Sequence, residues 1–440
     1  MSDFKEDKKG VNIEIASASD LDSLKFSDED EIEAEKIFGH DKSLAKSLNS
    51  RLLNTVALVG TIGTGLFLSS GGTLATTGPV GLVIAYLFVG SVVGANQICA
   101  CEVSCLVPVT GGYIAHSNYL VDPALSFMLG WISVYSSILP TDLSASAVLM
   151  TYWSDLNPAV WITVFGIVTL LVNLFSVRVY TEFEFIFGIL KLLLCIIFII
   201  TGLVIDLGGV PGQERLGFHY WKTPFESRYV EGSVGKFLAF WKSVSSTVYA
   251  FGGLQTISFL AGECEYPRRA IYRASKRIFY RVFTLYILTI FIISLVANSR
   301  DPLIANPDGT AAGSAFVIAV QRAGIKGLPH FINAVVLTSS ISATNLGPAE
   351  TGRIMWSLAS KGFAPKFFLK TNRFGLPWVG ITFASMFLPL AYMSVDKTAS
   401  TVFGWFQNIT SSKLLVTWCI ISINSIKLNS SLKSQGFSRS

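Results

Sequence analysis

The stretch Gly60-Thr61-Ile62-Gly63-Thr64-Gly65 interrupts the first long apolar run of the chain, and Ala250-Phe251-Gly252-Gly253 interrupts the sixth. Because each glycine in a helix interior costs about 1 kcal/mol relative to alanine, both stretches predict a break in a helix. The two breaks lie five apolar runs apart, which is the offset that two inverted five-helix repeats require. Glycine clusters also allow close helix packing, but their matching positions in the two halves favour a binding site between the breaks.

The composition indicates a membrane protein. The 440 residues are 51% hydrophobic and 14% charged, with a mean hydropathy of +0.53, whereas a soluble domain carries about 25% charged residues. The apolar residues fall into blocks close to the roughly 20 residues that cross a bilayer. The sequence therefore predicts an all-α polytopic membrane protein. It argues against a soluble enzyme, because no nucleophile, base or metal cluster lies outside the apolar blocks.

Apolar runs with polar boundaries predict about ten transmembrane helices. They lie near Leu53–Leu74, Val80–Cys99, Leu125–Tyr152, Pro158–Val177, Phe185–Ile205, Phe237–Leu260, Val282–Ala297, Pro329–Pro348, Trp378–Val395 and Val402–Ile423. Lys and Arg crowd the connection between the sixth and seventh helices and the one between the eighth and ninth. The positive-inside rule places both connections in the cytosol. An even number of spans then puts both termini on the same side.

The predicted organisation has three segments: a disordered cytosolic tail over residues 1–50, a transmembrane transporter domain over 51–426 and a cytosolic C-terminal tail over 427–440. The first tail is polar and contains the acidic stretch at 27–31, so it cannot bury enough apolar surface to fold alone. It also lacks the apolar core of a cleavable signal.

The charges and cysteines indicate neither a nucleic acid nor a metal ligand. The net charge of +5 comes from the tails and loops, which indicates topology and not nucleic-acid binding. The six cysteines show no zinc-like spacing with the four histidines. The sequence therefore implies no metal and no cofactor.

The two breaks suit an amino acid as ligand. A broken helix frees N–H groups where one half begins and C=O groups where the other half ends, and lipid cannot satisfy them. A substrate carboxylate is predicted at the first break and an ammonium at the second. The predicted substrate-binding residues are Thr61, Ile62, Gly63, Thr64, Gly65, Tyr249, Ala250, Phe251 and Gly252. Phe251, with Tyr249 and Trp241 on the same span, is either an aromatic lid over the substrate or a packing residue.

Ionisable residues inside apolar spans are rare and usually functional. Asp142 in the third span is predicted to exchange a proton; the alternative is a residue beside a water-filled vestibule. Lys191 in the fifth span either extends to the cytosolic face or points inward at the first break. Lys413 in the tenth span has no evident acidic partner in the sequence.

Further motifs resemble a known family. They are Gly60 to Phe67, Gly78-Pro79-Val80-Gly81, Glu102 followed by Pro108 to Gly112, Val121 to Leu125, Gly130-Trp131, Val177 to Tyr180 with Glu182 to Phe185, Ala261-Gly262-Glu263 with Pro267-Arg268-Arg269, and Gln321 to Gly324. Together they resemble the fungal amino acid permeases, the yeast branch of the amino acid, polyamine and organocation superfamily. The resemblance covers most of the chain.

The resemblance implies proton-coupled uptake of amino acids across the plasma membrane by alternating access, with ubiquitin-type regulation through the N-terminal tail. It assigns the substrate carboxylate to Thr61–Gly65 and the amino group to Tyr249–Phe251. Lys191 matches the family's lysine in the fifth span, and Asp142 stands where the family usually has a glutamate.

Several positions depart from the family pattern. Gln255 occupies a position where the family tends to carry glutamate, and an amide cannot exchange a proton at physiological pH. The family also has twelve spans, against ten predicted here. A second hypothesis follows: an amino acid sensor, or an inactive permease, of the same fold that does not transport.

Overall fold

A computed structural model describes residues 62–109, 111–175, 177–227, 230–255, 258, 267–305, 314–372, 375–396 and 399–435. These residues form helices and turns, with no β-strand among them. The α-helices are α3 (Thr64–Phe67), α4 (Ser69–Leu106), α5 (Gly112–Leu120), α6 (Pro123–Ser137), α7 (Thr141–Met150), α8 (Pro158–Phe175), α9 (Val177–Asp206), α10 (Ser233–Ala250), α12 (Pro267–Val296), α13 (Pro302–Ala305), α14 (Ala315–Arg322), α15 (Leu328–Ser360), α16 (Trp378–Ser385), α17 (Met393–Asp396) and α18 (Ala399–Ser434). Short 3-10 helices are η1 (His219–Lys222), η4 (Lys366–Leu369) and η5 (Leu388–Tyr392).

Within these ranges, six helical segments are long and apolar enough to cross a membrane. They are Ser69–Leu106, Pro123–Met150, Phe185–Asp206, Ile271–Val296, Trp378–Val395 and Thr401–Ser434. A shorter apolar helix covers Pro158–Asn173. The expectation of an all-α polytopic membrane protein is confirmed.

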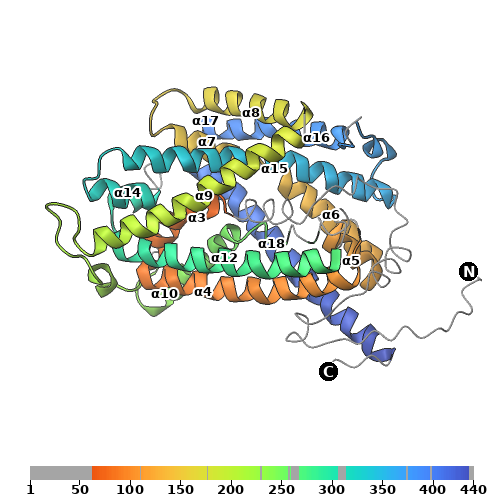
Figure 1. Cartoon of the computed structure of the whole chain (residues 1–440), viewed down its shortest axis with the longest axis horizontal. Helices are drawn as coiled ribbons and strands as arrows, with labels where there is room; N and C mark the ends of the chain where they lie inside the picture. Colours follow the sequence, from red (N-terminus) through yellow and green to blue (C-terminus); the bar gives the residue numbers. More distant parts are fainter. Residues whose placement is uncertain are drawn as a thin grey trace, which may run out of the picture.

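The helices pack lengthwise into one bundle (Figure 1). Helices α4, α10 and α12 lie along its lower edge, α8, α16 and α17 along its upper edge, and α18 crosses obliquely between them. Small residues on α4 allow the rings of α12 to approach: a Cβ atom on Gly90 would lie 2.6 Å from the Phe283 ring, and one on Gly94 would lie 2.5 Å from the Phe279 ring. Helices α4 and α12 can therefore pack closely along their length.

Four predicted spans are less regular than the sequence indicated. The third is not one helix, because it breaks between α6 and α7 at Pro140, where proline lacks an N–H group and clashes with the preceding turn. The ninth consists of α16, η5 and α17. The first and second are joined in α4 across a kink at Gly78, whose φ is +83°.

Several helices are longer than predicted. Helix α18 continues to Ser434, into the segment predicted as a tail, and α15 and α12 also extend past their predicted spans. The predicted N-terminal tail and the start of the first span lie outside the described residues.

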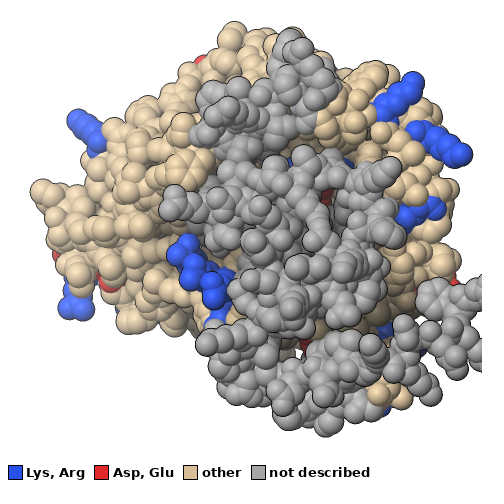
Figure 2. Space-filling view, turned by 45° about the vertical axis from the view of Figure 1, so that its right-hand side comes forward, with Lys and Arg blue, Asp and Glu red and all other residues tan. Residues whose placement is uncertain are grey.

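Figure 2 looks toward the end of the bundle where α5 lies. Blue Lys and Arg side chains outnumber the red acidic ones on the part of this face that grey atoms leave visible. The N-terminal half of α12 carries the basic residues 268, 269, 273, 276, 277 and 281, and Arg353 lies near the C-terminal end of α15.

Candidate functional site

The described residues include one side of each predicted helix break. Helix α3 begins at Thr64, directly after Gly63 in an extended conformation. Helix α10 ends at Ala250 and passes into a turn in which Gly253 has a φ of +97°. Thr61 lies outside the described residues, and Ile62 is buried. The two stretches are thus a helix start and a helix end, as the glycines predict.

The two breaks touch each other through backbone atoms. A Cβ atom on Gly65 would lie 2.5 Å from Cα of Ala250 and 3.0 Å from its backbone nitrogen. Only glycine fits at such a distance, since real Cβ atoms do not approach backbone this closely. By contrast, a Cβ atom on Gly63 would meet no atom within 4 Å. The first break therefore has one closely packed glycine and one that borders open space.

A carboxylate from a third helix contacts both breaks. The hydroxyl of Thr64 in α3 donates to Oδ1 of Asp142 at 2.6 Å, and the hydroxyl of Tyr249 in α10 donates to the same oxygen at 3.3 Å. The two hydroxyl oxygens lie 3.1 Å apart. Asp142 occupies the first turn of α7, just after the break in the third span. We refer to Thr64, Asp142 and Tyr249 as the bridging triad.

Serines hold the first turn of α7 in place. Oγ of Ser340 in α15 donates to the backbone oxygen of Asp142 at 2.6 Å, and Oγ of Ser146 donates to that oxygen at 3.0 Å. The two serine oxygens are themselves 2.9 Å apart. The Asp142 backbone is therefore tied to α15.

Lys191 is buried, with 1% of its surface exposed, so it does not extend to the membrane surface. Its Nζ donates to Oγ of Ser342 at 3.0 Å, and its charge contributes to the electrostatic environment of Asp142. Of the two alternatives for Lys191, extension to the cytosolic face is wrong, because the side chain is buried inside the bundle. Ser340 and Ser342 thus bring both ionisable residues of the site to α15.

Part of the backbone at the second break already has partners. The Tyr249 oxygen accepts from the Gly252 amide at 3.0 Å, and the Ala250 oxygen accepts from the Tyr286 hydroxyl at 3.1 Å. A carbonyl oxygen has two lone pairs, so each can accept a second hydrogen bond.

The three aromatic residues that the sequence placed near the second break lie in different environments. Phe251 is buried between the rings of Tyr86 and Tyr286, at centroid distances of 5.8 and 5.0 Å. It therefore packs toward α4 and α12. Trp241 is 57% exposed and stacks on Phe237, so the expectation that it helps to cover the substrate is wrong. Among the three, Tyr249 is the one that faces the first break.

Two further polar residues noted in the sequence, Gln255 and Lys413, are also buried. Gln255 follows the second break, and its side-chain oxygen has no hydrogen-bond partner among the described residues. Lys413 in α18 is also buried, and Tyr113 and Glu350 contribute to its electrostatic environment. Glu350 lies on α15 and is far from Lys413 in sequence, which is why the pattern of one span could not reveal it.

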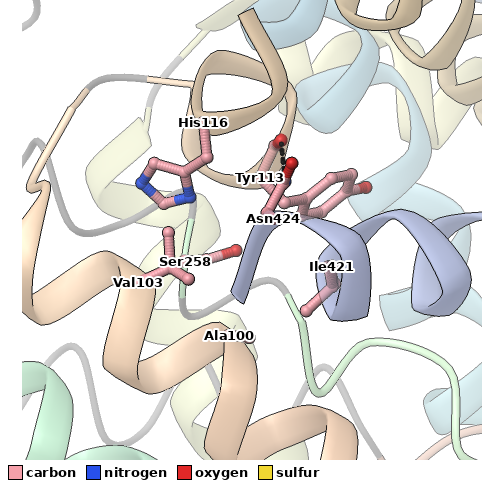
Figure 3. A pocket seen from close by; sticks show the side chains of 7 residues that line it. All are labelled: Ala100, Val103, Tyr113, His116, Ser258, Ile421 and Asn424. Carbon is pink, nitrogen blue, oxygen red and sulfur yellow. Dashed lines mark hydrogen bonds between the residues drawn. The ribbon is translucent and has the colours of Figure 1, made fainter. Parts of the chain in front are cut away.

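A separate cavity lies where α4, α5 and α18 meet (Figure 3). It is a narrow, partly open pocket with no room for a water molecule. The cavity is lined by Ala100, Val103, Tyr113, His116, Ser258, Ile421 and Asn424. The His116 ring donates from Nε2 to the backbone oxygen of Val107 at 2.8 Å, since a carbonyl can only accept. Burial lowers the pKa of His116 to about 4.

Sequence reasoning missed the residues that support the triad. Ser340, Ser342 and Tyr286 were not predicted to take part in the site. The signal available was the cluster of hydroxyl and amide side chains at 338–345 in an otherwise apolar span, because polar side chains in lipid-embedded helices usually hydrogen-bond across helices.

Comparison with known proteins gives concordant results. The family model described as amino acid permease matches residues 54–440. The dicarboxylic amino acid permease of Saccharomyces cerevisiae is 34% identical over 409 residues, covering 90% of this chain and 67% of that protein. The proline-specific permease of Emericella nidulans is 36% identical over 402 residues (89% and 73%), and the lysine-specific permease of Saccharomyces cerevisiae is 34% identical over 420 residues (93% and 68%). The chain thus spans about two thirds to three quarters of the length of these relatives.

Among solved structures, the chain is similar to the nucleobase-cation-symport-1 family transporter Mhp1 in a closed conformation with bromovinylhydantoin bound. The identity is 13%, the TM-score is 0.45, and the match covers 82% of this chain and 75% of that one. The sequence relatives carry the assignment. With the family model matching nearly nine tenths of the residues and relatives above 30% identity over most of the chain, this multi-pass membrane protein belongs to the amino acid permease family.

Proposed function

We propose that this permease takes up amino acids across the plasma membrane together with protons, by alternating access, with both termini in the cytosol. The observation that carries the proposal is the bridging triad: one carboxylate oxygen accepts hydrogen bonds from both broken helices. A change in the charge of that carboxylate therefore acts on both breaks at once.

The substrate would lie between the breaks. Its carboxylate would accept hydrogen bonds from the amides of Thr61 to Gly65, where the first turn of the helix leaves N–H groups without helical acceptors. Its ammonium would donate to the carbonyl oxygens of Tyr249 to Gly252, whose second lone pairs are available. The open space beside Gly63 supports this placement.

The proton would be exchanged at Asp142. The ionised carboxylate accepts from both hydroxyls, whereas the protonated acid has a donor in place of part of that capacity. Protonation would weaken the contact between α7 and the two breaks, which gives a proton a means of shifting the conformational equilibrium. Lys191 would stabilise the ionised form by its charge and take part in the same coupling.

The proposed substrates are amino acids. The names of the relatives specify different ones. They are called dicarboxylic, proline-specific and lysine-specific permeases. A competition screen, in which each of the twenty amino acids is added in excess over one labelled substrate, would identify the substrates of this chain.

The proposal is tested by uptake in liposomes containing the purified full chain, with an imposed pH gradient. We expect saturable uptake that increases when the outside is acidic. Asp142→Asn keeps the size of the side chain and removes the titrating group, so its uptake should no longer depend on the gradient. Asp155→Asn, at an exposed acid in the loop before α8, is the matched control.

Uptake by Asp142→Asn with the full pH dependence of the unaltered protein would overturn the role of this residue. Binding of amino acids without any uptake, at every pH, would favour the sensor hypothesis instead. Regulation through residues 1–50 by ubiquitin-type modification is a further part of the proposal, and replacement of the lysines in that segment should slow removal of the protein from the cell surface.

A further inference from the structure

The kink in α4 is covered by a segment from a distant connection. Gly78 has φ +83° and ψ 174°, and this conformation removes the helical partners of neighbouring backbone groups. The Glu226 amide donates to the Thr77 oxygen at 3.1 Å, and the Val80 amide donates to the Pro224 oxygen at 3.2 Å. Residues 224–226 thus supply partners to both sides of the kink.

Contact at the kink is too close for any residue but glycine. A Cβ atom on Gly78 would lie 2.9 Å from the Pro224 oxygen and 3.1 Å from the Glu226 amide nitrogen. The positive φ also favours glycine. The kink and the covering segment therefore depend on each other.

The Glu226 side chain anchors this segment to the end of α12. Its Oε1 accepts from Nε of Arg300 at 2.8 Å, and its Oε2 accepts from Nη2 at 3.3 Å. Oγ of Ser299 donates to Oε1 at 3.2 Å. The Glu226 side chain is 16% exposed and that of Arg300 is 65% exposed. Because the guanidinium binds the carboxylate through two nitrogens, the pair is geometrically specific.

We name residues 224–226, with Ser299 and Arg300, the clasp. It contacts the first span at Thr77, whereas the start of that span, at Gly65, packs against Ala250. The connection after α9, which contains residues 224–226, lies at the left end of the bundle in Figure 1. The half-helix from Thr64 to Thr77 is therefore held at both ends.

We propose that Glu226 is a positioning residue: by closing the clasp it fixes the half-helix Thr64–Thr77 and thereby sets the affinity of the amino acid site at its start. The second part of this inference rests on the proposed function. An isolated ion pair at a surface contributes little, but this one also keeps two backbone hydrogen bonds of a broken helix intact.

Hydrogen exchange of the purified full chain measures how well the backbone amides at the kink are protected, and it does not require transport. In Glu226→Gln we expect the amides of residues 76–81 to exchange about tenfold faster, since the loss of a charge-assisted hydrogen bond corresponds to a factor of roughly ten or more. The charge-swapped pair Glu226→Arg with Arg300→Glu should restore much of the protection. Arg300→Lys, which keeps the charge but not the two-nitrogen contact, should fall between them.

The neighbouring pair Asp301–Arg322 supplies the control. Arg322 also binds its partner through two nitrogens, at 2.9 and 3.1 Å, but it connects α14 to the residue before α13 and not to the kink. Asp301→Asn should leave exchange at residues 76–81 unchanged. The proposed role of Glu226 would be overturned if Glu226→Gln and the unaltered protein exchanged equally. It would also be overturned if Asp301→Asn had as large an effect as Glu226→Gln.

Uptake kinetics test whether the clasp affects substrate affinity, separately from whether the chain transports. If the chain transports, Glu226→Gln should raise KM about tenfold with little change in the maximal rate, as expected for lost binding affinity. An unchanged KM together with faster exchange would overturn the link between the clasp and the site. Failure of the unaltered protein to transport would count against the proposed function, while the exchange experiment would still decide whether Glu226 positions the half-helix.

Discussion

Thr64 and Asp142 come from different spans, and their side chains are joined by a hydrogen bond of 2.6 Å from Oγ1 to Oδ1. Thr64 is the first residue of α3, and Asp142 is the second residue of α7. Both residues therefore lie at a helix start that follows a break. This relationship makes the hydroxyl of Thr64 the most direct test of the site.

Thr64→Val removes that hydroxyl and keeps the shape of the side chain. We expect uptake at limiting substrate to fall by about tenfold or more, because a hydrogen bond to a charged group contributes about 1.5–3 kcal/mol. Thr64→Ser keeps the hydroxyl and should retain most of the activity. Equal uptake by the valine and serine variants, measured with labelled amino acid, would show that the hydrogen bond has no part in transport.

Gly65→Ala should abolish uptake and destabilise the protein, because the added methyl group would lie 2.5 Å from Cα of Ala250. Overpacking of this kind typically costs about 1–3 kcal/mol. Gly63→Ala provides the comparison two residues away, since its methyl group would meet no atom within 4 Å and the φ of Gly63 is −137°. Its thermal stability should stay near that of the unaltered protein; a loss as large as that of Gly65→Ala would contradict the packing described here.

Lys191→Met should keep the thermal stability of the protein but abolish uptake. The lysine is buried and bound to Ser342, and an apolar residue of similar length avoids the cost of burying a charge. We expect the thermal stability to be unchanged or higher and uptake to be lost. Ser342→Ala, which keeps the charge, should reduce uptake less; the reverse order of the two variants would argue against a role for the charge.

Acidification should destabilise the protein through His116, which lies in the connection between the second and third spans. Burial lowers its pKa to about 4, whereas histidine in an unfolded chain has a pKa of about 6.5. Between these values the unfolded chain binds a proton that the folded chain does not. Stability contributed by neutral His116 is therefore present above pH 6.5 and is lost as the pH falls toward 4, by at most about 1.4 kcal/mol per pH unit.

His116→Gln keeps a donor for the Val107 oxygen and does not titrate. Its melting temperature in detergent should fall less steeply between pH 6.5 and 4 than that of the unaltered protein. Parallel pH profiles for the two proteins would show that His116 is not the source of the slope.

The helical class could be predicted from the sequence, and so could the helix start after Gly63 and the helix end before Gly252, because glycine has a strong local effect on helices. The glycines at 60–65 and at 252–253 interrupt apolar runs, and each acts on its own segment. Pro140 carried an equally local signal, yet the third span was predicted as one helix. The apolar run there is long enough for one span, but the proline within it ends one helix before the next begins.

The contacts of the site could not be predicted in the same way. Tyr249 and Asp142 are far apart along the chain, and their meeting at 3.3 Å depends on how three helices pack. The burial of Lys191 likewise depends on Ser342 of another helix. Spacing within one span indicates which residues share a face, but not which helix covers that face.

The contact between Gly65 and Ala250 joins two backbones with no side chain between them. Side chains can change rotamer to absorb a small displacement, whereas backbones in contact cannot. The helix that begins at Thr64 and the end of α10 are therefore expected to move together at this contact. A ligand bound beside this contact would therefore act on the tilt of both helices.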